Sequence, residues 1–205
     1  MIRIVDYGVG NIQAFINLFD RLGIEAQRAS DPRAIEEATH LILPGVGHFD
    51  HAMQCLNESG MRPTLEELVL GKGVPLLGVC VGMQMLSTGS DEGKLPGLNW
   101  VPGRVRAFSS AAHLTHLPVP HMGWNDLRTS VGSKLFTKNF DEVPQFYFLH
   151  SYYFDAEDKV DVAATANYGI NFDAVVSREH IHGVQFHPEK SHRWGAQLLK
   201  NFVEM

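Results

Sequence analysis

The stretch Pro75-Leu76-Leu77-Gly78-Val79-Cys80-Val81-Gly82-Met83-Gln84-Met85-Leu86 decides the fold class of this chain. Residues 75–79 are continuously apolar, which is typical of a parallel strand that is covered on both faces. We expect a helix over residues 81–86 that begins as soon as the strand ends. A buried strand that leads directly into a helix is the repeating unit of α/β folds, so a parallel sheet is predicted.

The residues before this stretch repeat the same alternation. Residues 11–22 place Ile12, Phe15, Ile16 and Phe19 on one helical face, and this spacing predicts an amphipathic helix. Short apolar runs predict strands, and Pro32 is suited to the first turn of a short helix. The expected strands are Ile2 to Val5, Ile24 to Arg28, Leu41 to Leu43 and Pro75 to Val79, and further helices are expected at Phe49 to Leu56 and Leu65 to Leu70.

After Gly89 the pattern changes to short runs rich in Val, Tyr and Phe that are separated by Pro and Gly, so antiparallel strands are predicted. The candidate strands are Trp100 to Phe108, Gly123 to Arg128, Phe146 to Ser151, Val160 to Ala166, Ala174 to Ser177 and Ile181 to Phe186. A helix over Trp194 to Val203 is expected at the end. The sequence shows no repeat or linker, so it predicts one α/β domain over residues 1–205 with a mixed sheet.

Composition excludes several classes of function. The 205 residues are 44% hydrophobic and 20% charged, as in ordinary globular proteins and unlike disordered or fibrous ones. The net charge is −6 and no basic block is present, so nucleic acid is not an expected partner. The longest apolar run, Val74 to Leu86, is shorter than the ~18 residues that span a membrane. The first residues lack a charged leader followed by an apolar core, so we expect a cytoplasmic protein.

Cys80 lies between two glycines in the pattern Gly78-Val79-Cys80-Val81-Gly82. Gly-x-Cys-x-Gly at a strand–helix junction is the thiol form of the nucleophile elbow, in which a strained turn lifts the side chain above the sheet. The helix N-terminus favours a thiolate, and the N–H of Val81 points toward the place where an oxyanion forms. Alternatively, Cys80 is a small buried hydrophobic residue. Cys55 lacks glycine neighbours and a nearby base, so we expect it to pack, and both cysteines are expected as reduced thiols.

A thiol nucleophile needs a base, and the base needs a group that orients it. His187-Pro188-Glu189 follows the last expected strand. In extended backbone the side chains of residues i and i+2 lie on the same side, so Glu189 can hold the ring of His187 in the tautomer that faces Cys80. A loop histidine beside a surface glutamate is the alternative interpretation.

Two further motifs have weaker signals. Pro44-Gly45-Val46-Gly47 follows the third expected strand, so Gly47 supplies either a second oxyanion donor or only a turn. His113, His116 and His121 fit no zinc motif, and we expect them in a variable surface loop that holds no metal.

Taken together, these motifs resemble those of class I glutamine amidotransferases and, more narrowly, those of the glutaminase subunits of imidazole glycerol phosphate synthases. The resemblance covers nearly the whole chain, although residues 98–100 and 109–117 depart from the family pattern. It rests on Asp6-Tyr7-Gly8-Val9-Gly10-Asn11, Pro44-Gly45-Val46-Gly47, Gly78 to Gln84, Pro120-His121-Met122-Gly123-Trp124-Asn125, His150-Ser151-Tyr152 and Gly183 to Ser191.

The resemblance implies a flavodoxin-like α/β fold with a mostly parallel central sheet, helices on both faces and a small antiparallel addition. It implies hydrolysis of L-glutamine without a cofactor, with Cys80 as nucleophile, His187 as general base and acid, and Glu189 as the residue that orients His187. The other implied site residues are Gly47 and Val81 in the oxyanion hole, Gln84, Glu92, Ser151 and Tyr152 in glutamine binding, and Asn11, Trp124, Tyr147 and Lys190 at a partner interface.

The implied partner is a (β/α)8 cyclase subunit. The chain forms a heterodimer with it and passes ammonia to it, so that imidazole glycerol phosphate and an aminoimidazole carboxamide ribotide are made in histidine biosynthesis. Two alternatives stay open: a related subunit that feeds another synthase, such as one that makes an amidino sugar, and a free-standing Cys peptidase or esterase. A non-catalytic binding module is disfavoured by the complete triad.

Overall fold

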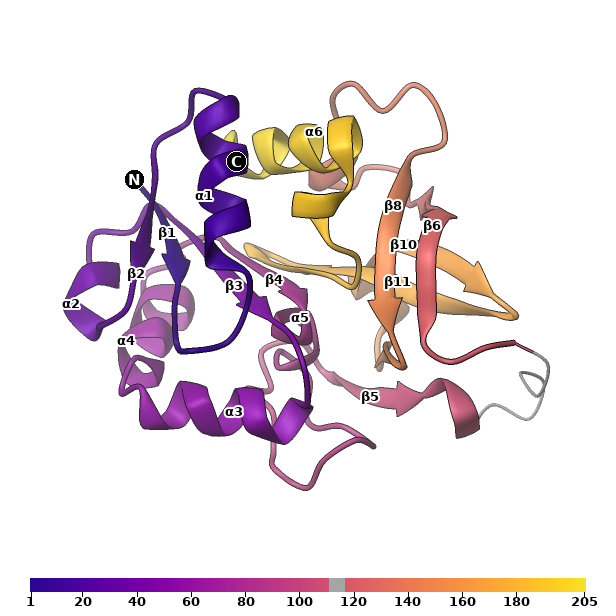
Figure 1. Ribbon diagram of the computed structural model, residues 1–205, viewed down its shortest axis with the longest axis horizontal. Coiled ribbons are helices and arrows are strands. Elements are labelled where there is room, and N and C mark those ends of the chain that lie inside the picture. The colour runs from indigo at the N-terminus through magenta and orange to yellow at the C-terminus, as the bar shows by residue number, and fades with distance from the viewer. Residues whose placement is uncertain (111–116) are drawn as a thin grey trace.

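The computed structural model describes residues 1–110 and 117–205, and its centre is one mixed sheet (Figure 1). Five parallel strands form the first part of the sheet in the order β2-β1-β3-β4-β12. Their bounds are β1 Ile2–Val5, β2 Ala26–Ala29, β3 His40–Gly45, β4 Leu76–Cys80 and β12 Ile181–Val184. The order of the first four strands is that of doubly wound flavodoxin-like folds, in which ligands bind at the carboxyl ends of the strands.

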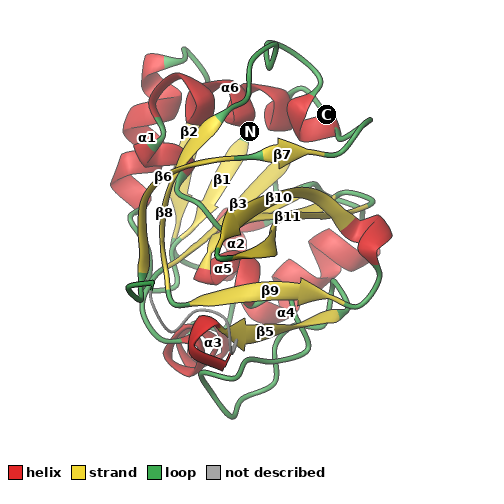
Figure 2. Ribbon diagram, turned by 90° about the vertical axis from the view of Figure 1, so that its right-hand side faces the viewer, coloured by secondary structure: helices red, strands yellow, loops and turns green. Residues whose placement is uncertain are grey.

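Antiparallel strands extend the sheet beyond β12. In order these are β11 (Ile170–Arg178), β10 (Val162–Tyr168) and β7 (Arg128–Thr129), while β9 (Tyr152–Ala156) also pairs with β11 and carries β5 (Gly103–Ala107). A separate two-stranded sheet consists of β6 (His121–Asp126) and β8 (Gln145–His150). Figure 2 shows β6 and β8 side by side at the edge of the molecule, away from the β5–β9 pair.

Helices cover both faces of the parallel part (Figures 1 and 2). One face carries α1 (Ile12–Arg21) and α6 (His192–Val203), and the other carries α3 (Phe49–Glu58) and α4 (Arg62–Glu66), with α2 (Pro32–Ile35) against α4. A π-helical turn continues α4 over Glu67–Gly71, and α5 (Val81–Gln84) follows β4 directly. Short 3-10 turns occupy Phe108–Ser110, Lys134–Phe136, Lys159–Asp161 and Pro188–Lys190.

The predicted α/β class and mixed sheet are confirmed, and α1 shows why the sequence signal was clear. Asn11 precedes the helix and its side chain accepts a hydrogen bond from the N–H of Ala14, which caps the first turn. Phe15 and Phe19 are fully buried on the face that contacts the sheet. Burial of each such ring stabilises the fold by about 1.5–3 kcal/mol.

Three details of the prediction are wrong. The helix after β4 ends at Gln84 rather than Leu86, because the carbonyls of residues 85 and 86 accept hydrogen bonds from the loop at residues 98–101. The strand β9 was not predicted, since only Ser151 separates it from β8 and no Gly or Pro marks the break. The strand β12 is antiparallel to β11 but parallel to β4, because a tight turn at Glu179 returns the chain beside β4.

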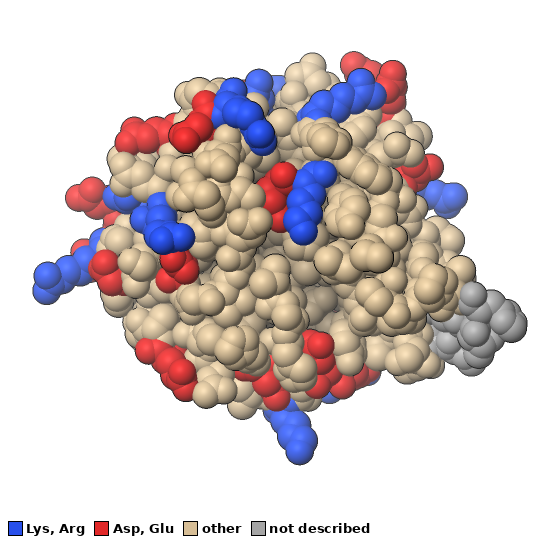
Figure 3. All heavy atoms as spheres, in the orientation of Figure 1, with Lys and Arg blue, Asp and Glu red and all other residues tan. Residues whose placement is uncertain are grey.

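The surface carries charges of both signs. Figure 3 shows Lys and Arg interspersed with Asp and Glu toward the outline of one face, while the centre of that face is largely uncharged. Across residues 1–110 and 117–205, the structure contains no helix with the length and apolar character of a bilayer span.

Candidate active site

Cys80 ends β4 in a strained backbone conformation. Its φ is 56° and its ψ is −113°, a region that non-glycine residues rarely adopt outside functional turns. Glycine is needed at positions 45 and 82 because the backbones of β3 and α5 meet beside Cys80. A Cβ at Gly82 would lie 1.9 Å from the carbonyl oxygen of Leu43, and one at Gly45 would lie 2.4 Å from the N atom of Gly82. The end of β3 and the start of α5 therefore pack backbone to backbone, and this contact fixes the elbow.

His187 lies just beyond β12, where its N–H donates to the carbonyl of Tyr147 at 2.9 Å. Its Nδ1 donates to Oε1 of Glu189 at 2.8 Å, and both side chains are at least 95% buried. The contact was predicted, but the extended backbone used to predict it is wrong. Residues 188–190 form a 3-10 turn, which brings the carboxylate back to the ring that precedes it.

The surroundings of His187 favour its protonated form. Burial lowers the pKa of His187, but hydrogen bonding and charge from Cys80 and Glu189 outweigh burial and raise this pKa to about 10. An imidazolium at neutral pH stabilises a thiolate beside it. The helix α5 has only four residues, so its dipole at Cys80 is small.

A cavity of about 290 Å³ opens over Cys80. It lies at the carboxyl ends of the parallel strands, where doubly wound folds bind ligands. Of the predicted site residues, Glu189 lies behind His187, and Asn11, Trp124 and Tyr147 lie outside the cavity. The predicted residues that line it are Gly47, Cys80, Val81, Gln84, Glu92, Ser151, Tyr152, His187 and Lys190.

Glu92 has a fixed position at the cavity. Its Oε2 accepts a hydrogen bond of 2.8 Å from the backbone N–H of Phe49, the first residue of α3. This carboxylate is therefore not the freely solvated surface charge that its polar sequence neighbours suggest. Burial and the charges of Glu92 and Asp91 raise the pKa of Tyr152, so Tyr152 faces a locally anionic wall.

Gln84 is held so that its carbonyl end is free. Its Nε2 donates to the carbonyl of Tyr152 at 3.2 Å and to Oε1 of Gln185 at 3.1 Å, which uses both amide hydrogens. The Oε1 of Gln84 is left as an acceptor at the cavity. In turn, Nε2 of Gln185 lies 3.8 Å from the sulfur of Cys80. No motif in the sequence marks Gln185 for a role, although it directly follows β12 and lies two residues before His187.

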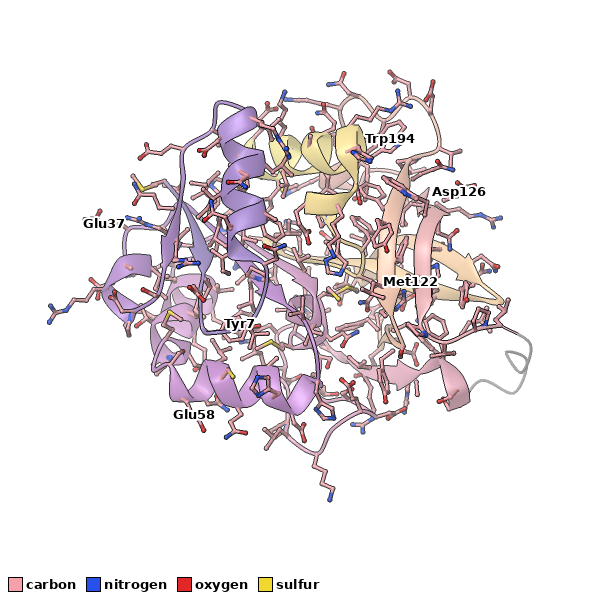
Figure 4. All side chains as sticks on the ribbon, viewed as in Figure 1. Tyr7, Glu37, Glu58, Met122, Asp126 and Trp194 are labelled. Atoms are coloured by element: carbon pink, nitrogen blue, oxygen red, sulfur yellow. The ribbon has the colours of Figure 1, made fainter. Side chains whose placement is uncertain are left out.

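The loop after β3, in which an oxyanion donor is predicted, contains Gly47, whose φ is +84°. Only glycine adopts such a conformation easily. The end of β3, just before this loop, is held in place because the hydroxyl of Tyr7 donates to the carbonyl of Pro44 at 2.7 Å. Tyr7 lies in the loop between β1 and α1 (Figure 4), and the sequence analysis did not single out its side chain.

The residues predicted at a partner interface are exposed or half-buried. Trp124 is 47% exposed and stacks on His192, with ring centroids 5.3 Å apart. The ring of Tyr147 lies edge-on to Trp124 at 6.2 Å and has Nζ of Lys190 5.9 Å from its centroid. These four side chains form one surface cluster beside the cavity, whereas exposed Asn11 caps α1. Met122, 65% exposed on β6 (Figure 4), adds apolar surface to the same small sheet.

Two expectations about other residues need correction. His121 is not in a surface loop: it is 97% buried in β6, where it stacks on Phe148 and Tyr168. His113 and His116 lie outside the described residues. Cys55 packs against the core as predicted, but a base is close to it, since a ring nitrogen of His51 lies 3.6 Å from its sulfur. Both cysteines are free thiols.

Comparisons with known proteins identify the family of the chain. A family model described as class-I glutamine amidotransferase matches residues 3–205. The chain is 56% identical to imidazole glycerol phosphate synthase subunit HisH of Bdellovibrio bacteriovorus and 46% identical to that of Leptospira borgpetersenii, with 100% of each chain covered.

Solved structures at lower identity show the same fold. A crystal structure described as a glutamine amidotransferase superposes with a TM-score of 0.75 at 19% identity, covering 99% of this chain and 97% of the other. PurLQS from Thermotoga maritima superposes with a TM-score of 0.70 at 18% identity and the same two coverages. By its sequence match over nearly its whole length, the chain belongs to the class-I glutamine amidotransferase family.

Proposed function

We propose that this chain is a glutaminase subunit that hydrolyses L-glutamine to glutamate and passes the ammonia to the cyclase subunit of an imidazole glycerol phosphate synthase. The observation that carries the chemistry is the arrangement of His187, which lies between the strained Cys80 and the buried carboxylate of Glu189. The names of the full-length relatives support the choice of synthase. We further propose the cytoplasm as the compartment.

The first half of the reaction forms a thioester. The thiolate of Cys80 attacks the side-chain carbonyl carbon of glutamine, and the negative charge moves to the carbonyl oxygen. The backbone N–H groups of Gly47 and Val81 stabilise this oxyanion. The imidazolium of His187 then gives its proton to the leaving nitrogen, the C–N bond breaks and ammonia departs.

The second half restores the enzyme. The neutral ring of His187 takes a proton from water, and the hydroxide attacks the thioester carbon. The C–S bond breaks, glutamate leaves and the thiolate of Cys80 is regenerated beside the imidazolium. Glu189 holds His187 in the orientation that both halves require.

The cavity residues fit the amino acid part of glutamine. Oε1 of Gln84 and the carboxylate of Glu92 are acceptors for the α-ammonium group, and Ser151 and Tyr152 offer donors for the α-carboxylate.

We propose that the surface cluster of Trp124, Tyr147, Lys190 and His192, together with Asn11, contacts the cyclase. A desolvated aromatic and cationic cluster is typical of the residues that carry binding energy at interfaces.

Partner dependence tests this proposal. Glutamate release is timed for the purified chain alone, with the cyclase subunit, and with the cyclase and its nucleotide ligand. We expect the last state to be faster than the first by ~100 to 1,000-fold, because a glycine-rich oxyanion loop rests with one donor turned away and one donor is worth that factor. A high rate for the chain alone, unchanged by either addition, would favour a free-standing hydrolase.

A further inference from the structure

Two buried histidines that the proposed reaction does not use lie behind the glutamine cavity. His150 is 6% exposed and contributes to the cavity wall, and His121 is 3% exposed on the neighbouring strand. Nδ1 of His121 lies 2.9 Å from Nε2 of His150. They sit among Phe108, Phe148 and Phe172, whose rings offer them no hydrogen-bonding group. A polar pair is costly in such surroundings unless every bond is made.

The contact of His150 with Tyr152 determines the direction of the hydrogen bonds in the pair. Nδ1 of His150 lies 2.7 Å from the carbonyl oxygen of Tyr152. A carbonyl only accepts, so this nitrogen carries a proton. In a neutral ring Nε2 of His150 is then an acceptor, and Nδ1 of His121 must donate to it. This leaves Nε2 of His121 as an acceptor.

The contact of His121 with Asn125 independently requires the same direction. Oδ1 of Asn125 accepts from the backbone N–H of Asp126 at 2.8 Å, and its Nδ2 donates to the carbonyl of Asn167 at 2.8 Å. These two backbone contacts determine which way the amide faces. The second hydrogen on Nδ2 of Asn125 is therefore available to Nε2 of His121, which lies 3.2 Å away.

Both ends thus require the same state, in which each ring is neutral and carries its proton on Nδ1. Burial supports this state, since it lowers the pKa of His150 to about 3 and that of His121 to about 4. The carbonyl oxygen of Tyr152 accepts the hydrogen bond from Nδ1 of His150 and also accepts one of 3.2 Å from Nε2 of Gln84. The histidine pair and the glutamine-binding amide are therefore joined through one oxygen atom.

We propose that His121 and His150 are positioning residues for glutamine: their hydrogen bonds hold the carbonyl of Tyr152, which holds the Gln84 amide with its oxygen toward the substrate. This inference rests on the proposed function, because it assumes that glutamine occupies the cavity. Among the described residues, the hydrogen-bond partners of the Cys80 sulfur are the carbonyl of Leu149 and Nε2 of Gln185, not either ring of the pair. Its loss should therefore weaken the binding of a glutamine-shaped molecule and leave the reactivity of the thiol unchanged.

The test is labelling of Cys80 in the full chain, read by peptide mass so that Cys55, the other free thiol, is measured separately. A chloroketone analogue of glutamine reports both binding, as the concentration for half-maximal rate, and thiol reactivity, as the limiting rate. Iodoacetamide reports thiol reactivity alone. The test variant is His121→Phe with His150→Phe, which suits the aromatic cluster and removes both partners together, a change that costs little stability. The matched control is His182→Phe, a histidine equally buried in β12 whose Nδ1 contacts only Ser177.

We expect the double variant to need about tenfold more chloroketone for half-maximal rate, the equivalent of one or two hydrogen bonds. Its limiting rate and its iodoacetamide rate should stay within about twofold of the unsubstituted chain. The control His182→Phe should change neither. His150→Asn, whose amide N–H replaces that of Nδ1 toward Tyr152, should recover most of the binding.

Each contrary outcome has a separate meaning. If iodoacetamide labels Cys80 in the unsubstituted chain but the chloroketone does not, the proposed function fails and the inference fails with it. If the chloroketone labels all variants with equal half-maximal concentrations, only the positioning role is overturned. A measurement that needs no variant completes the test: the imidazole ¹⁵N shifts of both rings should show neutral Nδ1–H tautomers at pH 7. An Nε2–H tautomer in either ring would contradict the hydrogen-bond direction.

Discussion

The hydroxyl of Tyr7 and the carbonyl of Pro44 form a hydrogen bond of 2.7 Å that joins the loop after β1 to the end of β3, just before the loop that contains Gly47. The same hydroxyl lies 3.4 Å from the sulfur of Met85, just after α5. Burial is the main reason that the pKa of Tyr7 is raised, so the hydroxyl stays protonated and donates. One side chain therefore connects the loop that supplies Gly47 with the turn that follows the nucleophile.

Tyr7→Phe should lower the free energy of unfolding by about 1–3 kcal/mol, because the buried carbonyl of Pro44 loses its donor. Urea unfolding measures this change. The matched control is Tyr168→Phe, which removes a hydroxyl bonded at the same 2.7 Å to Pro118 in an exposed setting and should cost less. Equal losses in the two variants would show that the Tyr7 bond has no special role.

Gly82→Ala should destabilise the fold by about 3 kcal/mol, because its Cβ would overlap the carbonyl oxygen of Leu43 and force β3 and α5 apart. The thermal unfolding midpoint is the measurement. Gly71→Ala is the control, since the nearest atom to its added Cβ is 3.9 Å away, and it should change stability little. A Gly82→Ala chain as stable as the control would contradict the backbone contact that we describe.

Acid should destabilise the protein between about pH 6.5 and pH 4. Burial lowers the pKa of His121, His150 and His182 to between about 3 and about 4, whereas in the unfolded chain they titrate near 6.5. Below pH 6.5 the unfolded state binds protons that the folded state does not, so each histidine removes up to ~1.4 kcal/mol per pH unit. The stability of a fold that keeps these rings neutral is therefore fully present above pH 6.5 and is lost as pH falls through this window.

Urea unfolding at pH 7, 6 and 5 measures this slope. The variant with His121→Phe and His150→Phe should show a shallower decline than the unsubstituted chain. His187 has the opposite sign: its raised pKa gives stability that is present below about pH 6.5 and is lost as pH rises through about 10. An acid slope that the double variant does not reduce would show that these two rings are not neutral in the folded state.

Lys190→Ala should weaken binding of the cyclase subunit by about 1–3 kcal/mol if the ammonium pairs with a desolvated partner group. Trp124→Ala should also weaken it, because it removes the largest exposed ring of the surface cluster. Titration calorimetry measures both. Lys72→Ala is the control, a lysine paired with Glu67 on an exposed turn, and it should leave the affinity unchanged. Unchanged affinity in all three variants would remove the interface assignment.

The sequence predicted those features that arise from neighbouring residues. The 75–86 stretch indicated both the parallel strand and the elbow, and His187 and Glu189 are close enough in sequence for their contact to be expected. Contacts between distant residues were not predictable. The Tyr7 hydroxyl meets Pro44 only because β1 and β3 pair, and Gln185 meets Gln84 only because β12 lies beside β4.

His121 shows the same limit in another form. In the sequence it is one of three histidines near a segment rich in turns, and nothing local distinguishes it from a surface residue. Only the pairing of β6 with β8 places it opposite His150, and only the aromatic cluster around them makes the pair buried. The residues that position a site come from packing, while the residues that react can be recognised from a motif.

The central claim is that Cys80 generates ammonia for the partner, and product formation by the complex from two nitrogen sources tests it most directly. With Cys80→Ala we expect synthesis from glutamine to be lost while synthesis from added ammonium salt proceeds at the unsubstituted rate, because the cyclase needs only ammonia. Cys55→Ala, the control thiol, should retain both activities. Glutamine-dependent synthesis by Cys80→Ala at the unsubstituted rate would contradict the account.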